Sequence, residues 1–283
     1  MPSMAPLEAA VIDQAVRSAL AEDLPSGDIT SEALFLPDAR SAAVFLAKEE
    51  GVVAGLRIAR RVFELIDPEV VFEAVSADGR EFKPGDILAR VEGRSISLLK
   101  AERTALNFLQ RLSGVASLTR RFVREVEGTK ARILDTRKTT PGLRALEKYA
   151  VTMGGGANHR FSLSDMVLIK DNHIRQVGSV REALRRARAA APFGVKVEVE
   201  VTDFAGAEQA VAGNADMIML DNMEPPEMKR VVTFVAGRVP LEASGKVSLE
   251  RVAEIARTGV DFISVGALTH SYRAIDISLE FQG

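Results

Sequence analysis

The segment Val195–Asn222, VKVEVEVTDFAGAEQAVAGNADMIMLDN, decides the fold class because it reads as a strand, a helix and a second strand. Val195–Val201 and Met217–Leu220 are apolar runs of strand length, and Phe204–Ala212 between them has helical spacing. Two parallel strands joined by a helix form a βα unit, in which helices cover the apolar strands. The segment therefore predicts an α/β fold.

The same alternation of strands and helices extends over the chain after Lys130. Four more strands are expected at Arg132–Leu134, Met166–Ile169, Val239–Ala243 and Phe262–Val265. Three more helices are expected at Ser179–Ala190, Pro226–Val235 and Leu249–Thr258. Repeated βα units commonly close into a barrel, so this part of the chain predicts an α/β barrel.

The first third lacks strict βα alternation. Strands are expected at Ala42–Ala47, Val70–Val75 and Ile87–Val91, and helices at Leu7–Leu24, Leu56–Ile66 and Ser95–Glu127, the last with a break near Ser113-Gly114. This mixture indicates a compact domain of strands and helices. We expect residues 1–110 to form it, residues 111–269 to form the barrel domain, and the segment 270–283 to be a candidate addition to the first domain.

Composition excludes several classes of function. The formal net charge is −2, with 37 Lys+Arg against 39 Asp+Glu, so no global basic field is available to hold nucleic acid or an anionic membrane. There is no Trp for stacking on bases. Met1–Pro6 has no basic region followed by a long apolar run, and no apolar stretch approaches the roughly 20 residues of a membrane span. We expect a cytoplasmic protein that binds neither nucleic acid nor membranes.

Cysteine is absent and there are 3 His. Disulfides, thiolate nucleophiles and Cys-based metal sites are therefore excluded, and a His-rich metal site is not expected. Chemistry in this chain has to rely on Arg, Lys, Asp and Glu.

Polar or glycine-containing strings follow the expected strands of the second part. They are Asp135-Thr136-Arg137-Lys138, Lys170-Asp171-Asn172-His173, Asp221-Asn222, Ser244-Gly245 and Gly266-Ala267. The carboxyl ends of parallel strands meet at one edge of a sheet or one mouth of a barrel. The sequence therefore predicts that these strings form one site.

The strand Val197–Val201 alternates strictly, so Glu198 and Glu200 share one face and the valines share the other. If the valines pack on helices, both carboxylates point into the barrel, where an unpaired charge is costly. Cations, a metal ion or substrate hydroxyls are then expected nearby. A purely structural ion-pair network is the alternative.

The expected mouth combines cations with carboxylates. Arg137, Lys138, Lys170 and the pair His159-Arg160 would face Glu200 and Asp221, which suits a polyanion together with magnesium or a ribose. Glycines in Ser244-Gly245 and Val265-Gly266 would let backbone N–H groups approach a phosphate.

Other features have plainer explanations. A single Arg or Lys after a strand is often solvated or ion-paired. Gly154–Gly156 is as consistent with a flexible turn as with a direct contact to a ligand. Arg185–Arg188 is typical of the solvated face of a helix. His173 and His270 are expected to be structural residues or neighbours of the site.

Several strings, in order along the chain, resemble the quinolinate phosphoribosyltransferase family. They are Thr136–Gly142 (TRKTTPG), Asn158–Arg160 (NHR), Ile169–His173 (IKDNH) and Met219–Asn222 (MLDN), preceded by Glu22–Leu24 (EDL), Gly27–Thr30 (GDIT), Glu102–Asn107 (ERTALN) and Arg111–Gly114 (RLSG). The resemblance spans essentially the whole chain. It implies an N-terminal α/β sandwich domain and an open seven-stranded α/β barrel, one strand more than the pattern supports.

The resemblance also implies an activity. Quinolinate and phosphoribosyl pyrophosphate would be converted, with Mg²⁺, to nicotinate mononucleotide, pyrophosphate and carbon dioxide in NAD biosynthesis. It further implies a homodimer with shared active sites, in which Arg103 crosses to the partner, and leaves a dimer-based hexamer open.

Roles carry over by position. The resemblance implies quinolinate carboxylates held by Arg103, Arg137, His159, Arg160 and Lys170, and catalysis by Lys138, Glu200 and Asp221. Glu200 and Asp221 would face the ribose and, indirectly through phosphoribosyl pyrophosphate, the metal. Its 5′-phosphate would meet Ser244, Gly245 and Gly266, with Thr136, Lys246, Val265 and Ala267 as further substrate-binding positions.

One position departs from the family pattern, because Lys246 stands where a glycine or asparagine is expected. Two other functions stay open at this point. One is a phosphoribosyltransferase of the same fold that acts on another anionic, nitrogen-containing ring. The other is a catalytically idle protein that binds phosphorylated sugars.

Overall fold

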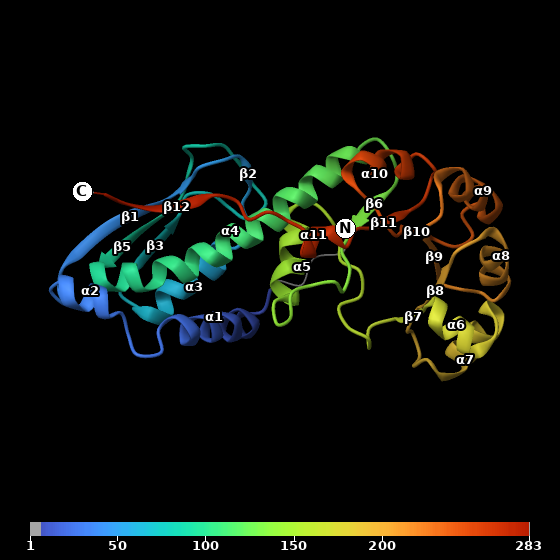
Figure 1. Cartoon of the computed structure of the whole chain (residues 1–283), viewed down its shortest axis with the longest axis horizontal. Helices are drawn as coiled ribbons and strands as arrows, with labels where there is room; N and C mark the ends of the chain where they lie inside the picture. The colour runs from blue at the N-terminus through green and yellow to red at the C-terminus, as the bar shows by residue number, and fades with distance from the viewer. Residues whose placement is uncertain (1–6, 283) are drawn as a thin grey trace. The chain divides into compact units, whose positions relative to one another are not determined.

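The computed structural model describes residues 7–282, so the expectation about Met1–Pro6 lies outside the described residues. The chain divides into two compact units (Figure 1). The first comprises the chain up to Arg120 together with 139–155 and the segment from Ser271, and the second comprises 121–138 and 156–270.

The first unit contains an antiparallel sheet in the order β12-β1-β5-β3 and a small pair β2-β4. Its strands are β1 (Arg40–Ala47), β2 (Gly51–Val52), β3 (Val71–Ala74), β4 (Glu81–Phe82), β5 (Ile87–Arg94) and β12 (Ile277–Gln282). Its helices are α1 (Ala9–Asp23), α2 (Ile29–Leu34), α3 (Leu56–Ile66), α5 (Arg144–Met153) and most of α4 (Ser95–Glu125). Phe45, Phe63 and Leu88 are fully buried in its core.

The C-terminal segment belongs to this sheet. Strand β12 pairs antiparallel with β1, from Ala42 opposite Gln282 to Ala47 opposite Ile277. The first unit also extends past residue 110 to Arg120, because α4 continues without interruption.

The predicted break in this helix at Ser113-Gly114 is wrong. A Cβ on Gly114 would collide with the carbonyl oxygen of Arg273, so this glycine allows a close approach of two backbones. Ser113 is fully buried, and its hydroxyl accepts the backbone N–H of Ala54 at 3.1 Å. Both residues serve packing within the first unit, and neither ends the helix.

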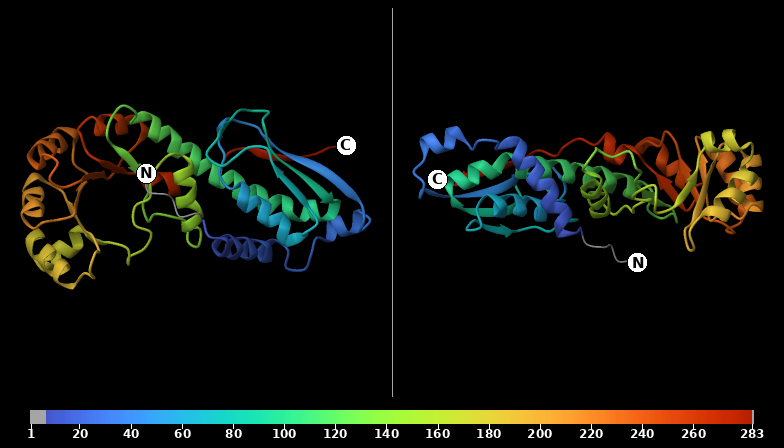
Figure 2. Two further views of the ribbon diagram at one scale, coloured as in Figure 1. Left: turned by 180° about the vertical axis from the view of Figure 1, so that it is seen from behind. Right: turned by 90° about the horizontal axis from the view of Figure 1, so that it is seen from below.

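The second unit is a parallel sheet with helices along its outer side (Figure 2). Its strands follow the order β6-β11-β10-β9-β8-β7, with bounds β6 (Arg132–Leu134), β7 (Val167–Ile169), β8 (Val197–Val201), β9 (Met217–Asp221), β10 (Leu241–Ser244) and β11 (Phe262–Ser264). Its helices are α6 (Asp171–Val177), α7 (Val180–Ala190), α8 (Phe204–Ala212), α9 (Pro225–Val235), α10 (Leu249–Ala256) and α11 (Ala267–His270).

This architecture confirms the predicted α/β class. The six predicted strands are all present, with ends within a few residues of the predicted ones. Ala157 adds a parallel bridge to Leu134 of β6, at the edge where a seventh strand would pair. Because the strands are parallel, their carboxyl ends share one edge of the sheet.

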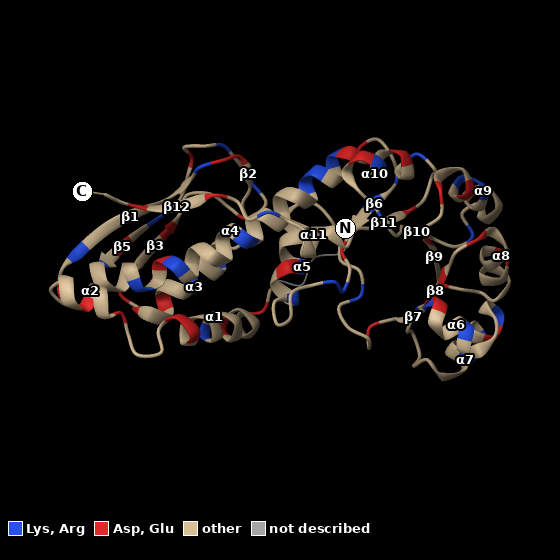
Figure 3. Cartoon of the chain, in the orientation of Figure 1, with Lys and Arg blue, Asp and Glu red and all other residues tan. Residues whose placement is uncertain are grey.

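Charged residues of both signs are spread over both units (Figure 3). The basic run on α7 is a solvated face, as expected, since Arg185 and Arg186 are exposed and pair with Glu182. Within residues 7–282 no helix combines the length and the apolar character needed to cross a bilayer.

Candidate active site

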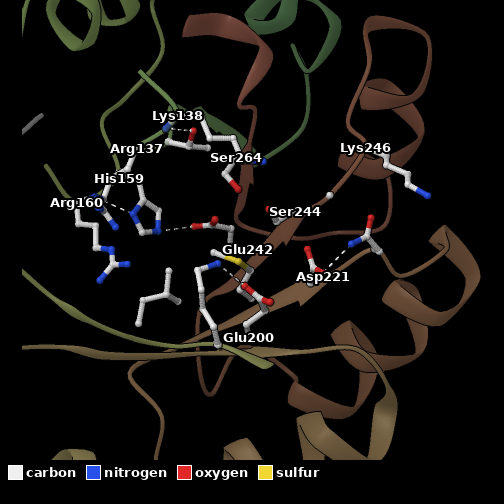
Figure 4. Close-up of a pocket in the computed structure, with 16 residues that line it drawn as sticks. Arg137, Lys138, His159, Arg160, Glu200, Asp221, Glu242, Ser244, Lys246 and Ser264 are labelled. Carbon is white, nitrogen blue, oxygen red and sulfur yellow. Dashed lines mark hydrogen bonds and ion pairs between the residues drawn. The ribbon is translucent and has the colours of Figure 1, made fainter. Parts of the chain in front are cut away.

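A pocket of about 580 Å³ lies in the second unit at the carboxyl ends of the parallel strands (Figure 4). Polar and charged side chains make up most of its wall. The lining residues are Thr136, Arg137, Lys138, His159, Arg160, Leu168, Lys170, Glu200, Met219, Asp221, Asn222, Glu242, Ser244, Gly245, Lys246 and Ser264. The strings that follow separate strands therefore come together, as predicted.

Most of the residues proposed for the site line this pocket. The exceptions are Arg103, Val265, Gly266 and Ala267. Arg103 lies on an exposed position of α4 in the first unit. Val265 is buried and its N–H bonds Leu134 O at 2.9 Å, so this N–H is already used within the sheet. Gly266 lies next to the pocket, since a Cβ there would be 3.0 Å from Cδ of Lys138.

Two arginines stand on one side of the pocket. Nη1 of Arg160 donates to the carbonyl oxygen of Met166 at 3.0 Å, which holds the guanidinium in place. Burial lowers the pKa of Arg160, and the neighbouring charge of Arg137 lowers it further. Two like charges held this close favour an anion between them.

Lys170 and Glu200 face each other across neighbouring strand ends. Nζ of Lys170 donates to Oε2 of Glu200 at 2.7 Å, and the Glu200 side chain is 9% exposed while that of Lys170 is 47% exposed. The prediction that Glu200 needs a nearby cation is therefore confirmed by the geometry. Lys170 can also reach solvent or a ligand.

The loop after β10 is shaped by a glycine. Gly245 has φ +90°, and a Cβ on it would collide with the side-chain amide of Asn222. Nδ2 of Asn222 in turn donates to Oδ2 of Asp221 at 2.6 Å. Gly245 thus lets the loop approach the end of β9, where Asp221 faces the pocket.

Lys246 adopts a left-handed backbone conformation with φ 49°. Glycine and asparagine are the residues that enter this region most readily, which explains why one of them is expected here. The Lys246 side chain is exposed and extends away from Ser244 and Asp221 in Figure 4.

Asp135 positions the loop that carries His159. Its side chain is fully buried, Oδ1 accepts the backbone N–H of His159 at 2.9 Å, and Oδ2 accepts Nδ2 of Asn158. The Ala157 bridge to β6 anchors the same loop. This explains why the NHR string reaches the pocket.

His159 forms a buried cluster with Glu198 and Glu242. Its Nε2 lies 3.0 Å from Oε2 of Glu198 and 3.4 Å from Oε2 of Glu242. Burial lowers the pKa of His159, but the hydrogen bond with Glu198 and the charges of both glutamates outweigh burial and raise it. Burial, with the charge of Glu242, raises the pKa of Glu198. Both shifts favour retention of a proton in the cluster.

Sequence reasoning did not assign Glu242 or Ser264 to the site. Both are buried, and within the described residues neither carboxylate oxygen of Glu242 nor the hydroxyl of Ser264 has a hydrogen-bond partner. A signal for Glu242 exists, because it interrupts an apolar strand just as Glu198 and Glu200 do. The apolar lining residues Leu168 and Met219 carry no such signal.

Comparisons with known proteins agree with this geometry. The family profile "Quinolinate phosphoribosyl transferase, C-terminal domain" matches residues 115–280, and the corresponding N-terminal profile matches residues 28–113. A "Probable nicotinate-nucleotide pyrophosphorylase [carboxylating]" of Bacillus subtilis is 43% identical, covering 92% of this chain and 89% of that protein. "Quinolinate phosphoribosyltransferase [decarboxylating] 2b, mitochondrial" of Nicotiana tabacum is 41% identical, covering 95% and 82%.

A solved structure shows the same fold. The nicotinate-nucleotide pyrophosphorylase of Francisella tularensis superposes with a TM-score of 0.93 at 40% identity, over 98% of each chain. Since the two profiles together cover most of the chain and the relatives match along nearly their whole length, this chain belongs to the quinolinate phosphoribosyl transferase family.

Proposed function

We propose that this pocket joins the ring nitrogen of quinolinate to C1 of the ribose of phosphoribosyl pyrophosphate. Pyrophosphate leaves in that step, and the C2 carboxylate then leaves as carbon dioxide, which gives nicotinate mononucleotide for NAD biosynthesis. The observation that carries this proposal is the lining of one pocket by Arg137, Lys138, Arg160 and Lys170 opposite Glu200 and Asp221, in a chain of this family.

The cationic side of the pocket suits the two carboxylates of quinolinate. Guanidinium groups bind carboxylates through paired hydrogen bonds, and each charge-assisted bond contributes roughly 1.5–3 kcal/mol. Arg137 and Arg160 stand together, and Lys170 is exposed enough to exchange part of its contact with Glu200 for a ligand carboxylate. That exchange would leave Glu200 available to the ribose.

The opposite side suits the phosphoribosyl group. Asp221 ends β9 and Glu200 lies one residue before the end of the neighbouring strand β8, so carboxylate oxygens are available to ribose hydroxyls. Ser244 and Gly245 would bind the 5′-phosphate through the loop that Gly245 keeps close to β9. Gly266, beside Lys138, would allow the same kind of approach from the next loop.

Magnesium fits this side of the pocket. Asp221 is partly exposed and Glu200 lies beside it, and carboxylate oxygens combined with substrate phosphates are the donors that Mg²⁺ prefers. We propose that these two residues hold the ion indirectly, through bound phosphoribosyl pyrophosphate. The ion would neutralise charge on the departing pyrophosphate.

The chemistry then rests on electrostatics and orientation. Departure of pyrophosphate leaves positive character on the ribose, which the carboxylates of Glu200 and Asp221 would stabilise. After carbon dioxide departs, its bonding electrons stay at C2, where the positively charged ring nitrogen stabilises them until a proton arrives. Lys138 is the proposed donor of that proton or its electrostatic helper. Replacing Lys138 by Ala without slowing product formation would remove this role.

Arg103 and the homodimer belong to the proposal as well. The exposed position of Arg103 in the first unit suits a residue that reaches a partner's pocket. Mixing Arg103→Ala with Lys138→Ala protein should partly restore activity if sites are shared. No recovery in heterodimers would contradict shared sites. A dimer-based hexamer and the cytoplasmic compartment stay predictions.

Substrate preference tests the proposal against its nearest rival. Purified protein should use quinolinate in strong preference to nicotinate when rates are compared at equal concentrations with phosphoribosyl pyrophosphate and magnesium. A marked preference for nicotinate or another ring would favour the paralogous reaction. Any turnover would exclude an idle sugar-phosphate-binding protein.

A further inference from the structure

Both ring nitrogens of His159 are engaged within the protein. Nδ1 accepts the backbone N–H of Arg160 at 2.8 Å, while Nε2 faces Glu198 at 3.0 Å (Figure 4 shows the contacts with Arg160 and Glu242). A ring nitrogen that accepts a hydrogen bond carries no hydrogen. The arrangement therefore describes a neutral ring with its hydrogen on Nε2.

Two carboxylates compete for this single N–H. Glu198 on β8 and Glu242 on β10 are fully buried, and a buried carboxylate without a donor is costly. Within residues 7–282, Oε1 of Glu198 and both oxygens of Glu242 make no hydrogen bond, although Oε2 of Glu242 lies 3.4 Å from the ring nitrogen. Residues kept at such a cost, beneath a polar pocket, point to a role in the site.

Arg160 is the residue that this arrangement controls. Its backbone N–H is held by the His159 ring and its guanidinium by the carbonyl oxygen of Met166. The side chain stands in the pocket wall beside Arg137. These two contacts hold the backbone and the guanidinium of Arg160. Because the first contact is made by the His159 ring, a change in the protonation or orientation of that ring would move the guanidinium.

We propose that Glu198 and Glu242 are positioning residues: by holding the Nε2 hydrogen of His159 they fix one tautomer, and Nδ1 of that tautomer fixes Arg160. His159 then acts in the pocket by orienting Arg160, and donation of a ring N–H to a ligand carboxylate is not its role. An imidazolium would carry a hydrogen on Nδ1 that points at the Arg160 N–H. The raised pKa values of His159 and Glu198 both favour an added proton in the cluster. Because Nδ1 accepts the Arg160 N–H, that proton lies on a carboxyl group and the ring stays neutral.

The charged groups around His159 and Arg160 come from four parts of the chain. Glu198 approaches from β8, Glu242 from β10, Arg160 from the same loop, and Arg137 from the segment after β6. Asp135 accepts the backbone N–H of His159. The tautomer is a property of the free protein, whereas its consequence for quinolinate rests on the proposed function.

The first test uses the wild-type protein. Long-range ¹H–¹⁵N correlation spectra of protein labelled at the imidazole nitrogens report which nitrogen carries hydrogen, and the chain has only 3 His. His173→Gln and His270→Gln variants assign the signals. At neutral pH the spectrum should show His159 with hydrogen on Nε2 and an unprotonated Nδ1. A hydrogen on Nδ1, in a neutral ring or an imidazolium, would overturn the proposal.

The second test separates positioning from packing. Glu198→Gln keeps an oxygen that accepts the Nε2 hydrogen, whereas Glu198→Leu removes it at similar volume. Glu198→Leu should shift the tautomer and raise KM for quinolinate about tenfold, the lower end of what losing an orienting partner costs, with KM for phosphoribosyl pyrophosphate nearly unchanged. Glu198→Gln should keep the wild-type tautomer and the wild-type KM for quinolinate. Glu254→Leu, on an exposed position of α10, serves as control.

Two results would contradict this account. Equal increases in both KM values would indicate a general loss of structure, and an unchanged KM for quinolinate in a folded Glu198→Leu protein would remove the link to Arg160. If wild-type protein does not turn over quinolinate at all, the proposed function fails, while the tautomer in the free protein still decides the positioning claim.

Discussion

Asp67 in the first unit and Glu242 in the second are buried carboxylates with opposite surroundings. In the first unit, Asp67 accepts hydrogen bonds from Arg94 Nε at 2.8 Å, Ser97 Oγ at 2.7 Å and the backbone N–H of Glu69 at 3.1 Å. In the second unit, Glu242 is equally buried and, among the described residues, has no hydrogen-bond partner for either oxygen.

Their effects on protonation differ in the same way. The hydrogen bond from Arg94 holds the pKa of Asp67 far below its usual range, whereas burial raises the pKa of Glu198, the neighbour of Glu242. A satisfied carboxylate stabilises the fold, and an unsatisfied one costs stability. The contrast teaches that Asp67 is held for structure, while Glu242 is kept unsatisfied beside the pocket, where it serves function.

The largest effect is expected from the pocket's arginines. Arg160→Ala removes a guanidinium that can bind a carboxylate through two charge-assisted hydrogen bonds, so kcat/KM for quinolinate should fall by about 100-fold or more. Steady-state kinetics measures this, with Arg185→Ala on the exposed face of α7 as control. A fall of about fivefold or less, as expected for a solvated charge, would contradict the assignment.

A matched pair of substitutions tests the structural side. Glu147 is fully buried, accepts Nη2 of Arg111 at 2.6 Å and accepts the N–H of Thr140 at 3.0 Å. Glu147→Gln breaks this buried pair and should lower the free energy of unfolding by about 3 kcal/mol. Glu242→Gln loses no hydrogen bond and should cost less than about 1 kcal/mol.

Urea-induced unfolding measures both variants against wild type. If Glu242→Gln is as destabilising as Glu147→Gln, Glu242 is a structural carboxylate like Glu147 and the contrast fails.

Acid should weaken the first unit through Asp67. Because the folded pKa of Asp67 lies below the unfolded value of about 4, its stabilisation is complete above that value and is lost as pH falls through the folded one. Asp67→Asn should therefore make the free energy of unfolding less sensitive to pH below about 4. Unfolding titrations at several pH values check this, with the exposed Asp38→Asn as control. An unchanged pH slope would remove Asp67 as a contributor.

The smallest effect concerns the phosphate loop. Lys246 has φ 49°, a conformation that costs a residue with a Cβ about 1 kcal/mol, and asparagine tolerates it better. Lys246→Asn should raise the free energy of unfolding by several tenths of a kcal/mol or more, measured by thermal and urea unfolding. A loss of stability would mean that the Lys246 side chain makes a favourable interaction.

Periodicity predicted the parallel sheet because its strands are short apolar runs separated by amphipathic helices. It mispredicted α4, since Gly114 is a packing contact with Arg273 rather than a stop signal. Helix α6 begins at Asp171, inside a polar string that suggested only the end of a strand. Local patterns do not show which backbone segments approach each other.

The site was predictable to the extent that it follows strand ends. Arg137, Lys170 and Asp221 follow or end strands, so parallel topology brings them together, and strict alternation within β8 pointed to Glu200. Glu242 was missed because it is the single carboxylate in its strand, without the strict alternation of Val197–Val201, and its importance depends on the contact with His159, which is distant in sequence. Burial and pairing of a carboxylate are tertiary properties, and the sequence does not state them.

The most direct measurement follows nicotinate mononucleotide and released carbon dioxide together, from purified protein given quinolinate, phosphoribosyl pyrophosphate and magnesium. We predict that both appear in equal amounts and that Arg160→Ala lowers both to the same extent. Folded protein that forms neither product, or forms a nucleotide without releasing carbon dioxide, would contradict the assigned reaction.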